Sequence, residues 1–199
     1  MRFAFITFVL IALLVVGMGP SYAGQIVTFG PRETKIEGSI PYSVIGKYKA
    51  QFGAFKGKII LDDRSQQVQS VYLSITPGSI RSNCPWCDKI VCSRRLLDIE
   101  RYPKVIFKSF RINRDNYGYK VTGVLEMHGI RKIMTFPFDV KAIVDRRAGG
   151  KFLDINGVWR INRKDFHIVW SKLLDRGGVL VGDYLTVDWA IKVFIKDLY

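Results

Sequence analysis

The stretch YLTVDWAIKVFI, residues 184–195, has the pattern that decides the fold. Apolar side chains occupy every second position from Leu185 to Ile195, and mostly polar residues stand between them. A repeat of two residues over this length predicts a β-strand with one buried and one exposed face. The same alternation recurs in MTFPFDVKAIV, residues 134–144, and in YKVTGVLEM, residues 119–127. The chain is therefore expected to be built from amphipathic strands.

Turn-forming pairs separate the predicted strands, among them Pro77-Gly78, His128-Gly129 and Gly149-Gly150. Strands joined by short turns, with little helical periodicity, favour an all-β antiparallel sandwich or barrel. The chain also has 13 Phe, nine Tyr and four Trp. These aromatic residues either fill the core or line a barrel that holds one small ligand. The pattern alone leaves both interpretations open.

The first 23 residues are expected to be a secretory signal peptide rather than part of the fold. Arg2 precedes an apolar run from Phe3 to Val16, and Ser21-Tyr22-Ala23 forms a small-residue cleavage site. The run is shorter than the ~20 residues of a membrane span, so an anchor is the weaker interpretation. We expect cleavage before Gly24, a single domain over residues 24–199, and a periplasmic or secreted location.

The chain of 199 residues has a formal net charge of +14, but its basic residues are scattered, without a run of five or six. An exported basic protein meets anionic lipid headgroups and cell-surface polymers rather than nucleic acid. Peripheral contact with an anionic membrane is one interpretation, and a simply solvated surface is the other. No nucleic-acid partner is expected, and no oligomeric state is assigned.

All three cysteines, Cys84, Cys87 and Cys92, fall in the stretch SNCPWCDKIVC, residues 82–92. An oxidising compartment favours one disulfide among them, with one cysteine left over. A thiol-redox role for the Cys84/Cys87 pair is the first alternative, because a Cys-x-x-Cys spacing can lower a thiol pKa. Zinc is the second, but it normally needs four ligands and no metal site is predicted.

Enzyme activity has no positive support in the sequence. The chain lacks a Gly-x-Ser-x-Gly motif, a phosphate-binding loop and a paired-histidine metal motif. His128 precedes Gly129 in a predicted hairpin turn and is expected to be exposed to solvent. No catalytic residue is therefore predicted.

Several stretches together resemble the YceI-like family of exported lipocalin-fold proteins, often called polyisoprenoid-binding. The resemblance runs from about Ile36 to Ile195. It implies an eight-stranded antiparallel lipocalin-like β-barrel with a short helix or loop insertion and a long apolar cavity. In characterised members that cavity holds a polyisoprenoid chain, such as that of a quinone or prenyl phosphate. The matching stretches are FGAFKGKIILDD (52–63), VYLSITPGSI (71–80), LLDIERYPKVIFKS (96–109), YKVTGVLEMHGIRKIMTFPFDV (119–140), INRKDFHI (161–168) and LVGDYLTVDWAIKV (180–193).

The chain departs from the family pattern at three places. Ile90 stands where the family usually has a histidine, so no polar role of that histidine is carried over. Leu96-Leu97 replaces a usual Phe-Phe pair, and His167 replaces a glycine in a turn. Contacts with the ligand's head group are expected to differ from those in relatives.

We interpret the chain as an exported carrier that binds, sequesters or transports an isoprenoid or other long apolar lipid. No cofactor is expected beyond a bound isoprenoid lipid or quinone. The alternatives are a thiol-redox module and a filled barrel that acts as a stress or interaction protein without a ligand. The lumen is predicted to be lined by Val121, Leu125, Met127, Phe136, Phe138, Trp159, Leu185, Val187 and Trp189.

Overall fold

The computed structural model describes residues 24–32, 34–42, 46–62, 65, 67–116, 118–145, 147, 149–170 and 181–196. The predicted signal peptide, residues 1–23, lies outside this part of the chain, so its removal stays a prediction. Among the described residues, no helix combines the length and hydropathy needed to cross a membrane.

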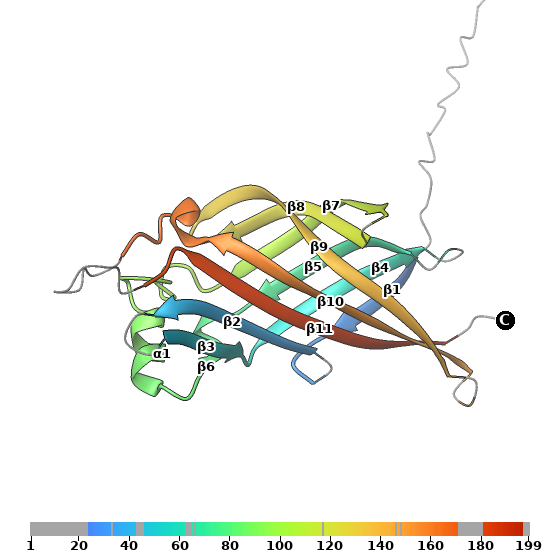
Figure 1. The fold of residues 1–199 in the computed structure, drawn as a ribbon, viewed down its shortest axis with the longest axis horizontal. Helices are drawn as coiled ribbons and strands as arrows, with labels where there is room; N and C mark the ends of the chain where they lie inside the picture. The colour runs from blue at the N-terminus through green and yellow to red at the C-terminus, as the bar shows by residue number, and fades with distance from the viewer. Residues whose placement is uncertain are drawn as a thin grey trace, which may run out of the picture.

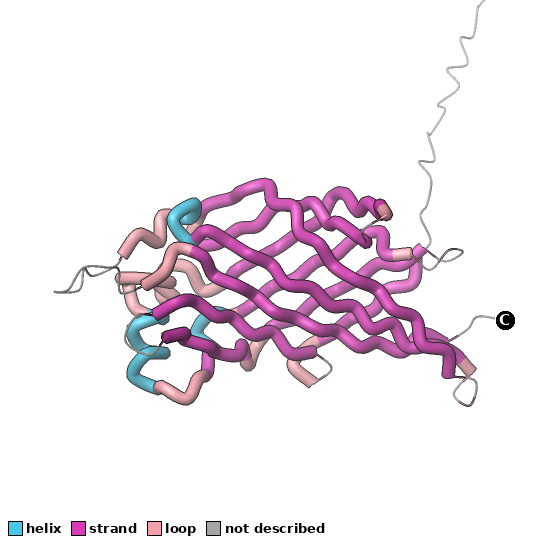
Figure 2. Tube along the Cα trace, viewed as in Figure 1, coloured by secondary structure: helices cyan, strands magenta, loops and turns pink. Residues whose placement is uncertain are grey.

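Eleven strands form one antiparallel sheet, accompanied in the described residues by one α-helix and two short 3₁₀ helices (Figure 1). The strands are β1 Gly24–Phe29, β2 Thr34–Tyr42, β3 Gly46–Phe52, β4 Phe55–Asp62, β5 Val68–Ile75, β6 Ile80–Arg81, β7 Val105–Asp115, β8 Gly118–Met127, β9 Ile130–Asp145, β10 Gly150–Asn162 and β11 Tyr184–Lys196. The helices are η1 Pro77–Ser79, α1 Pro85–Cys92 and η2 Arg163–Phe166. All helical segments gather at one end of the molecule (Figure 2).

The sheet is strongly curled, and its strand order is β1-β4-β5-β7-β8-β9-β10-β11-β2-β3-β6. The expected eight-stranded closed barrel is corrected in two respects. The strands number eleven, whereas the resemblance implied eight. Three of the eleven are short: β1, β3 and β6 have six, seven and two residues, and such segments carry little alternation. In addition, no strand pairing among the described residues joins the end strands β1 and β6, so the sheet forms a half-barrel.

The predicted alternation holds along β11, where Val187, Ile191 and Ile195 are buried and Asp188 and Lys192 are exposed. This strand pairs with β10 over its whole length and with β2 over residues 186–191. Both neighbours present apolar residues to the same interior, so the buried faces of three adjacent strands form one continuous wall.

The second half of β9 departs from the predicted pattern. Ala142 and Val144 were expected on the buried face with Phe136 and Phe138, but both are exposed, and Val144 is 67% exposed. At the end away from α1, β9 continues past β8, whose pairing with it ends at Phe138, so that the second half of β9 is paired with β10 alone (Figure 1). The alternating pattern therefore predicts the strand correctly in this segment, but the apolar side chains do not lie in the core.

Candidate ligand-binding cavity

The curled sheet encloses an apolar cavity of about 180 Å³, measured as the space open to the centre of a water-sized sphere. The end away from α1 is closed by side chains that are at most 6% exposed, namely those of Leu61, Leu153, Val193 and Ile195. At the other end, Trp86 of α1 lines the cavity and is itself 65% exposed. The cavity therefore reaches the surface beside α1, and we call this end the mouth.

Eight of the nine residues predicted to line the lumen do line this cavity, namely Val121, Leu125, Met127, Phe138, Trp159, Leu185, Val187 and Trp189. Phe136 does not line it, because its ring lies flat against Trp159, with ring centroids 4.2 Å apart and an angle of 9° between the planes. Phe136 therefore packs against the Trp159 ring, which forms the cavity wall at this point. Ligand binding by the eight residues stays a prediction.

Arg163 is the one charged residue among the described residues that line the cavity. Its side chain is 4% exposed, and its guanidinium donates hydrogen bonds to the backbone oxygens of Gly182 (2.8 Å), Val181 (3.1 Å), Trp170 (3.0 Å) and Ile168. Burial lowers the pKa of Arg163, and the nearby Asp183 carboxylate opposes that effect. The guanidinium thus holds two loop segments together at the mouth.

Four buried polar atoms have no hydrogen-bond partner within the described part of the chain, and their residues all line the cavity. They are Thr34 Oγ1, Ser39 Oγ, Trp159 Nε1 and Trp189 Nε1. More than 90% of buried polar groups in native proteins are paired, so such a group in a cavity wall points to a partner outside the chain. The wall is apolar with a few fixed neutral polar groups, which is typical of small-molecule sites.

Helix α1 covers the mouth. Pro85 occupies its first turn, where the missing N–H costs nothing, and the Cys84 sulfur accepts a hydrogen bond from the Cys87 N–H at 3.3 Å. Cys87 is buried against Tyr48, Ala50 and Ile80, outside the main core cluster. Ile90 lines the cavity together with Val91 and the Leu96-Leu97 pair. This part of the mouth is therefore apolar.

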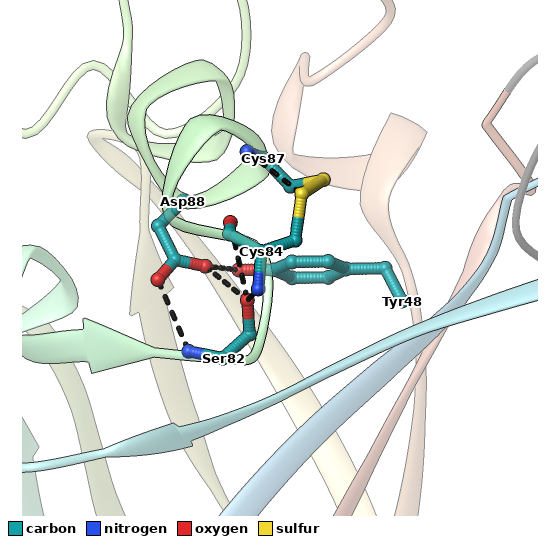
Figure 3. The surroundings of a disulfide bond; sticks show 5 residues. All are labelled: Tyr48, Ser82, Cys84, Cys87 and Asp88. Carbon is teal, nitrogen blue, oxygen red and sulfur yellow. Dashed lines mark hydrogen bonds between the residues drawn. A yellow bond between two sulfur atoms is a disulfide. The ribbon is translucent and has the colours of Figure 1, made fainter.

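A disulfide joins Cys84 to Cys87 at the start of α1 and leaves Cys92 free (Figure 3). The structure thus selects one pair from the three cysteines that the sequence offered. Burial, followed by the nearby Asp88 carboxylate, raises the pKa of the half-buried Cys92 thiol. A thiol with a raised pKa is less ionised at neutral pH and is a weaker nucleophile. No group of three or more potential metal-binding side chains occurs among the described residues.

Asp88 ties α1 to the sheet through three hydrogen bonds (Figure 3). Its carboxylate accepts from the Tyr48 hydroxyl at 2.6 Å, the Ser82 N–H at 3.0 Å and the Ser82 hydroxyl at 2.5 Å. Burial acts to raise the pKa of Asp88, but the hydrogen bonds from Ser82 and Tyr48 outweigh it, and the pKa is lowered. Burial and the bond to Asp88 also raise the pKa of Tyr48. The carboxylate stays ionised and fixes the helix over the mouth.

Both histidines lie in turns with left-handed backbone. His128 has a φ of 53° and was expected to be exposed, but it is half-buried: its Nδ1 lies 3.0 Å from the Phe166 oxygen and its ring is 4.5 Å from that of Tyr102. His167 has a φ of 57° where relatives are expected to carry glycine. Histidine tolerates this conformation better than most residues, so the turn keeps its shape.

The sequence reasoning missed Arg163, Thr34 and Trp86. Arg163 could have been found, because it continues the inward positions of Trp159 and Ile161 at a spacing of two. Thr34 is 4% exposed at the start of β2, where alternation is too short to assign a face. Trp86 reaches the cavity only because α1 folds over the mouth, and the expected short helix or loop insertion did not indicate where it would pack.

Comparison with known proteins identifies the fold. Residues 28–193 match the model of the YceI-like domain family. A UPF0312 protein of Enterobacter sp. (strain 638) is 27% identical over 124 residues, which are 61% of this chain and 65% of that protein, so the match spans less than two thirds of the relative's length. The crystal structure of BcnA from Burkholderia cenocepacia has a TM-score of 0.68 at 21% identity, covering 81% of this chain and 97% of that one.

A second solved structure is described as a polyisoprenoid binding domain from Saccharophagus degradans. It aligns with a TM-score of 0.59 at 11% identity and covers 86% of this chain and 98% of that one. At this identity the likeness concerns the fold alone. Both structures have the same curled antiparallel architecture as this chain.

Proposed function

The chain belongs to the YceI-like domain family, and from this premise we propose that it binds, sequesters or transports an isoprenoid or other long apolar lipid in its cavity. The observation that carries the proposal is the cavity, whose wall is formed by inward apolar faces from most of the strands. A structural relative is described as a polyisoprenoid binding domain, which agrees with a ligand of this class.

The length of the cavity supports a chain-like ligand. Its wall includes every inward position of β11 from Leu185 to Ile191. Six residue steps along a strand cover about 20 Å at ~3.3 Å each. A space that is long relative to its volume of about 180 Å³ is narrow, and it suits a single extended hydrocarbon chain better than a compact ring system.

Such a ligand can enter and leave reversibly. Burial of each methylene from water is worth about 0.8 kcal/mol, but a lipid in a membrane is already buried to the same degree. Transfer between membrane and cavity is therefore nearly balanced in free energy. Shape and polar contacts then decide which lipids are bound.

The surface around the mouth supports delivery at a membrane. Trp86 is 65% exposed there, and the indole ring of tryptophan favours the membrane interface. Exposed basic residues lie on α1 and its flanking segments, namely Arg81, Lys89, Arg94, Arg95 and Arg101.

We expect co-sedimentation with anionic phosphatidylglycerol vesicles to fall in Trp86→Ala and in Lys89→Glu. The matched control is Val158→Ala, which removes an exposed apolar side chain on β10. Equal binding by all variants would contradict membrane delivery.

Export completes the proposal, and it rests on the sequence of residues 1–23 alone. A periplasmic or secreted carrier would be recovered as a chain that begins at Gly24. N-terminal sequencing of protein from the periplasmic and membrane fractions tests this. Recovery of chains that begin at Met1 in washed membranes would show an anchor instead.

Lipid extraction from protein purified without detergent tests the carrier function itself. Native mass spectrometry of the parent should show bound lipid, and extraction should identify an isoprenoid or similar long-chain molecule. Leu125→Trp should reduce bound lipid, because Leu125 lines the cavity and the larger side chain occupies its space. A parent that carries no lipid and takes none up from vesicles would leave the filled, non-binding barrel as the better interpretation.

A further inference from the structure

A second pocket lies inside the curl of the sheet, at the end away from α1. Its volume is about 210 Å³, measured in the same way as that of the apolar cavity. The loop between β4 and β5 and the adjacent ends of β5, β7, β8, β9 and β10 border it (Figure 1). The buried Val68, which lines both spaces, and Leu153 of the packed end separate it from the apolar cavity. The pocket is therefore a second compartment of the fold.

Two cationic side chains occupy inward positions in this pocket. Lys151 on β10 lies two residues before the buried Leu153. Arg114 on β7 lies two residues after Ile112, which is paired with the buried Val121 on β8. Side chains on one face of a strand repeat every two residues, so Lys151 and Arg114 both lie on the inner face of the sheet. The inner face thus changes from apolar to cationic at this end.

The two positive charges are not compensated within the pocket. None of the described residues that line it is acidic. In the described part of the chain, no ion pair or hydrogen bond engages the Arg114 guanidinium or the Lys151 ammonium. Two like charges that share a pocket repel each other, and a bound anion would turn that repulsion into attraction.

The carboxylates near the pocket are engaged with other groups. Asp62 accepts hydrogen bonds from Ser65 and from Gln69. Asp115 forms an ion pair with Lys120 at 2.8 Å. The acidic residues of β9 alternate with those that line the pocket, so they lie on the outer face of the sheet. The pocket is therefore suited to a negatively charged ligand.

An aromatic row positions the Arg114 guanidinium. The guanidinium carbon lies 5.2 Å from the centroid of the Tyr119 ring, which in turn lies 5.2 Å from that of Phe138. These three residues are successive partners across β7, β8 and β9. A guanidinium packed on an aromatic ring keeps its N–H fork available for an acceptor. The Lys151 ammonium and the Gln67 amide supply further donors in the same pocket.

We propose that this pocket binds a small phosphate-bearing anion at a site separate from the apolar cavity. A phosphate group carries a charge of about −1.5 to −2 at neutral pH and has three strong acceptor oxygens, which matches two cations and several donors. Arg114 can bind two of these oxygens through its fork, and Lys151 adds a point charge. The inference does not rest on the proposed function, because the lipid cavity lies on the other side of the packed end.

Isothermal titration calorimetry of the purified protein with glycerol 3-phosphate at low ionic strength tests the inference. Glycerol is the uncharged probe and succinate is a dicarboxylate of similar charge. We expect glycerol 3-phosphate to bind more tightly than succinate, and glycerol to show no binding. Arg114→Gln and Lys151→Gln should each weaken binding of the phosphate by about 10-fold or more, the range for a hydrogen bond to a charged group.

Arg111→Gln and Lys141→Gln are the matched controls. Arg111 lies on β7 and Lys141 on β9, both are exposed, and both alternate with the inward positions of their strands. Each control removes the same charge from the outer face of the sheet. Binding of glycerol 3-phosphate should remain nearly unchanged in both.

Ala142→Trp tests the space of the pocket while both cations are retained. Ala142 is exposed and lines the pocket, so a larger side chain can occupy the space without disturbing the core. We expect this variant to lose most of the phosphate binding while its thermal unfolding and its content of bound lipid match those of the parent. Phosphate should also raise the midpoint of thermal unfolding of the parent more than that of the variant.

The possible results separate a built site from general attraction to a basic protein. Equal weakening in the inward and outward variants would show attraction to the net charge alone and would overturn the inference. Failure of the parent to bind glycerol 3-phosphate, or tighter binding of succinate, would overturn it as well. None of these results bears on the lipid extracted from the apolar cavity, so the proposed function is judged separately.

Discussion

The hydroxyl of Tyr48 on β3 donates a 2.6 Å hydrogen bond to the carboxylate of Asp88 on α1, across 40 residues of sequence. This bond and those from Ser82 connect the helix that covers the mouth to the wall of the cavity. The stability of the mouth is therefore coupled to the ionisation of one carboxylate.

Acid should loosen α1 through Asp88. Its pKa in the folded protein is lowered from the ordinary value of 3.8, so its stabilising contribution is present above the unfolded pKa and is lost as the pH falls through the folded pKa. Asp88→Asn should lower the free energy of unfolding at pH 7 by about 1–2 kcal/mol. This gap, the difference in stability between the parent and the variant, should shrink below pH ~3.8. Urea unfolding across pH 2–7 measures this. Glu100→Gln, which alters a carboxylate that is 80% exposed, is the control, and a gap that does not depend on pH would contradict the assignment.

A larger side chain in the cavity wall should reduce stability less than a larger side chain at the packed end. Val187 and Val193 both face inward on β11, but Val187 lines the cavity and Val193 does not. Val187→Phe should change the free energy of unfolding little and reduce lipid binding, whereas Val193→Phe should cost about 1–3 kcal/mol through overpacking. Thermal or urea unfolding of delipidated protein compares the two. Equal and large losses would show that the cavity is filled by the chain itself.

Alkylation without reduction should label one cysteine. The Cys84–Cys87 disulfide leaves Cys92 as the free thiol, and mass analysis of peptides should place the label there. Because burial raises the Cys92 pKa, labelling should be slow at neutral pH and faster in mild denaturant. Labelling of all three cysteines in protein from an oxidising compartment would show that the disulfide is absent.

The thiol-redox alternative makes a different prediction from the same residues. Cys84 is half-buried at the start of α1 and Cys87 is buried, so a partner thiol would have to attack Cys84. If the pair is structural, Cys84→Ser and Cys87→Ser should increase hydrogen exchange of α1 without changing insulin reduction by dithiothreitol. Catalysed insulin reduction by the parent, lost in both variants, would favour the redox module.

Loss of Arg163 should destabilise the mouth strongly. Arg163→Met leaves four backbone oxygens without their buried donor, and we expect a loss of about 3 kcal/mol in the free energy of unfolding. Arg160→Met is the control, since Arg160 is exposed and lies 4.1 Å from the ring of Tyr184. It should lose about 1 kcal/mol or less. Similar losses in the two variants would contradict the role of Arg163 as a clamp.

Alternation predicted the strands and most of the cavity wall, because a period of two fixes which side chains share a face before any tertiary contact forms. Val121, Leu125 and Met127 on β8 face inward as predicted, as do Val187 and Trp189 on β11. The resemblance to the YceI-like family implied an eight-stranded barrel, and the structure has one curled sheet of eleven strands instead. Membership of the family is confirmed by the match over residues 28–193.

Other features depend on how far each strand extends and on what packs beyond its end. Ala142 and Val144 alternate like core residues but lie beyond the point where the pairing of β9 with β8 ends. Phe136 faces inward yet is covered by Trp159. The choice of Cys84 and Cys87 as partners depends on the turn that starts α1. The first two outcomes are set by segments distant in sequence, whereas the cysteine pairing is set by a turn of four residues whose geometry the spacing alone does not specify.

The sequence by itself determined an all-β chain with an apolar inner face, because the period of the side chains is a property of the strand. Only the tertiary structure decided that one end is packed by Leu61 and Ile195 while the other opens beside Trp86. It also decided that the Arg163 guanidinium is used within the chain while the indoles of Trp159 and Trp189 are left unpaired. Pairing of a buried polar group depends on which atoms lie within about 3 Å of it in space, and the order of residues does not specify that.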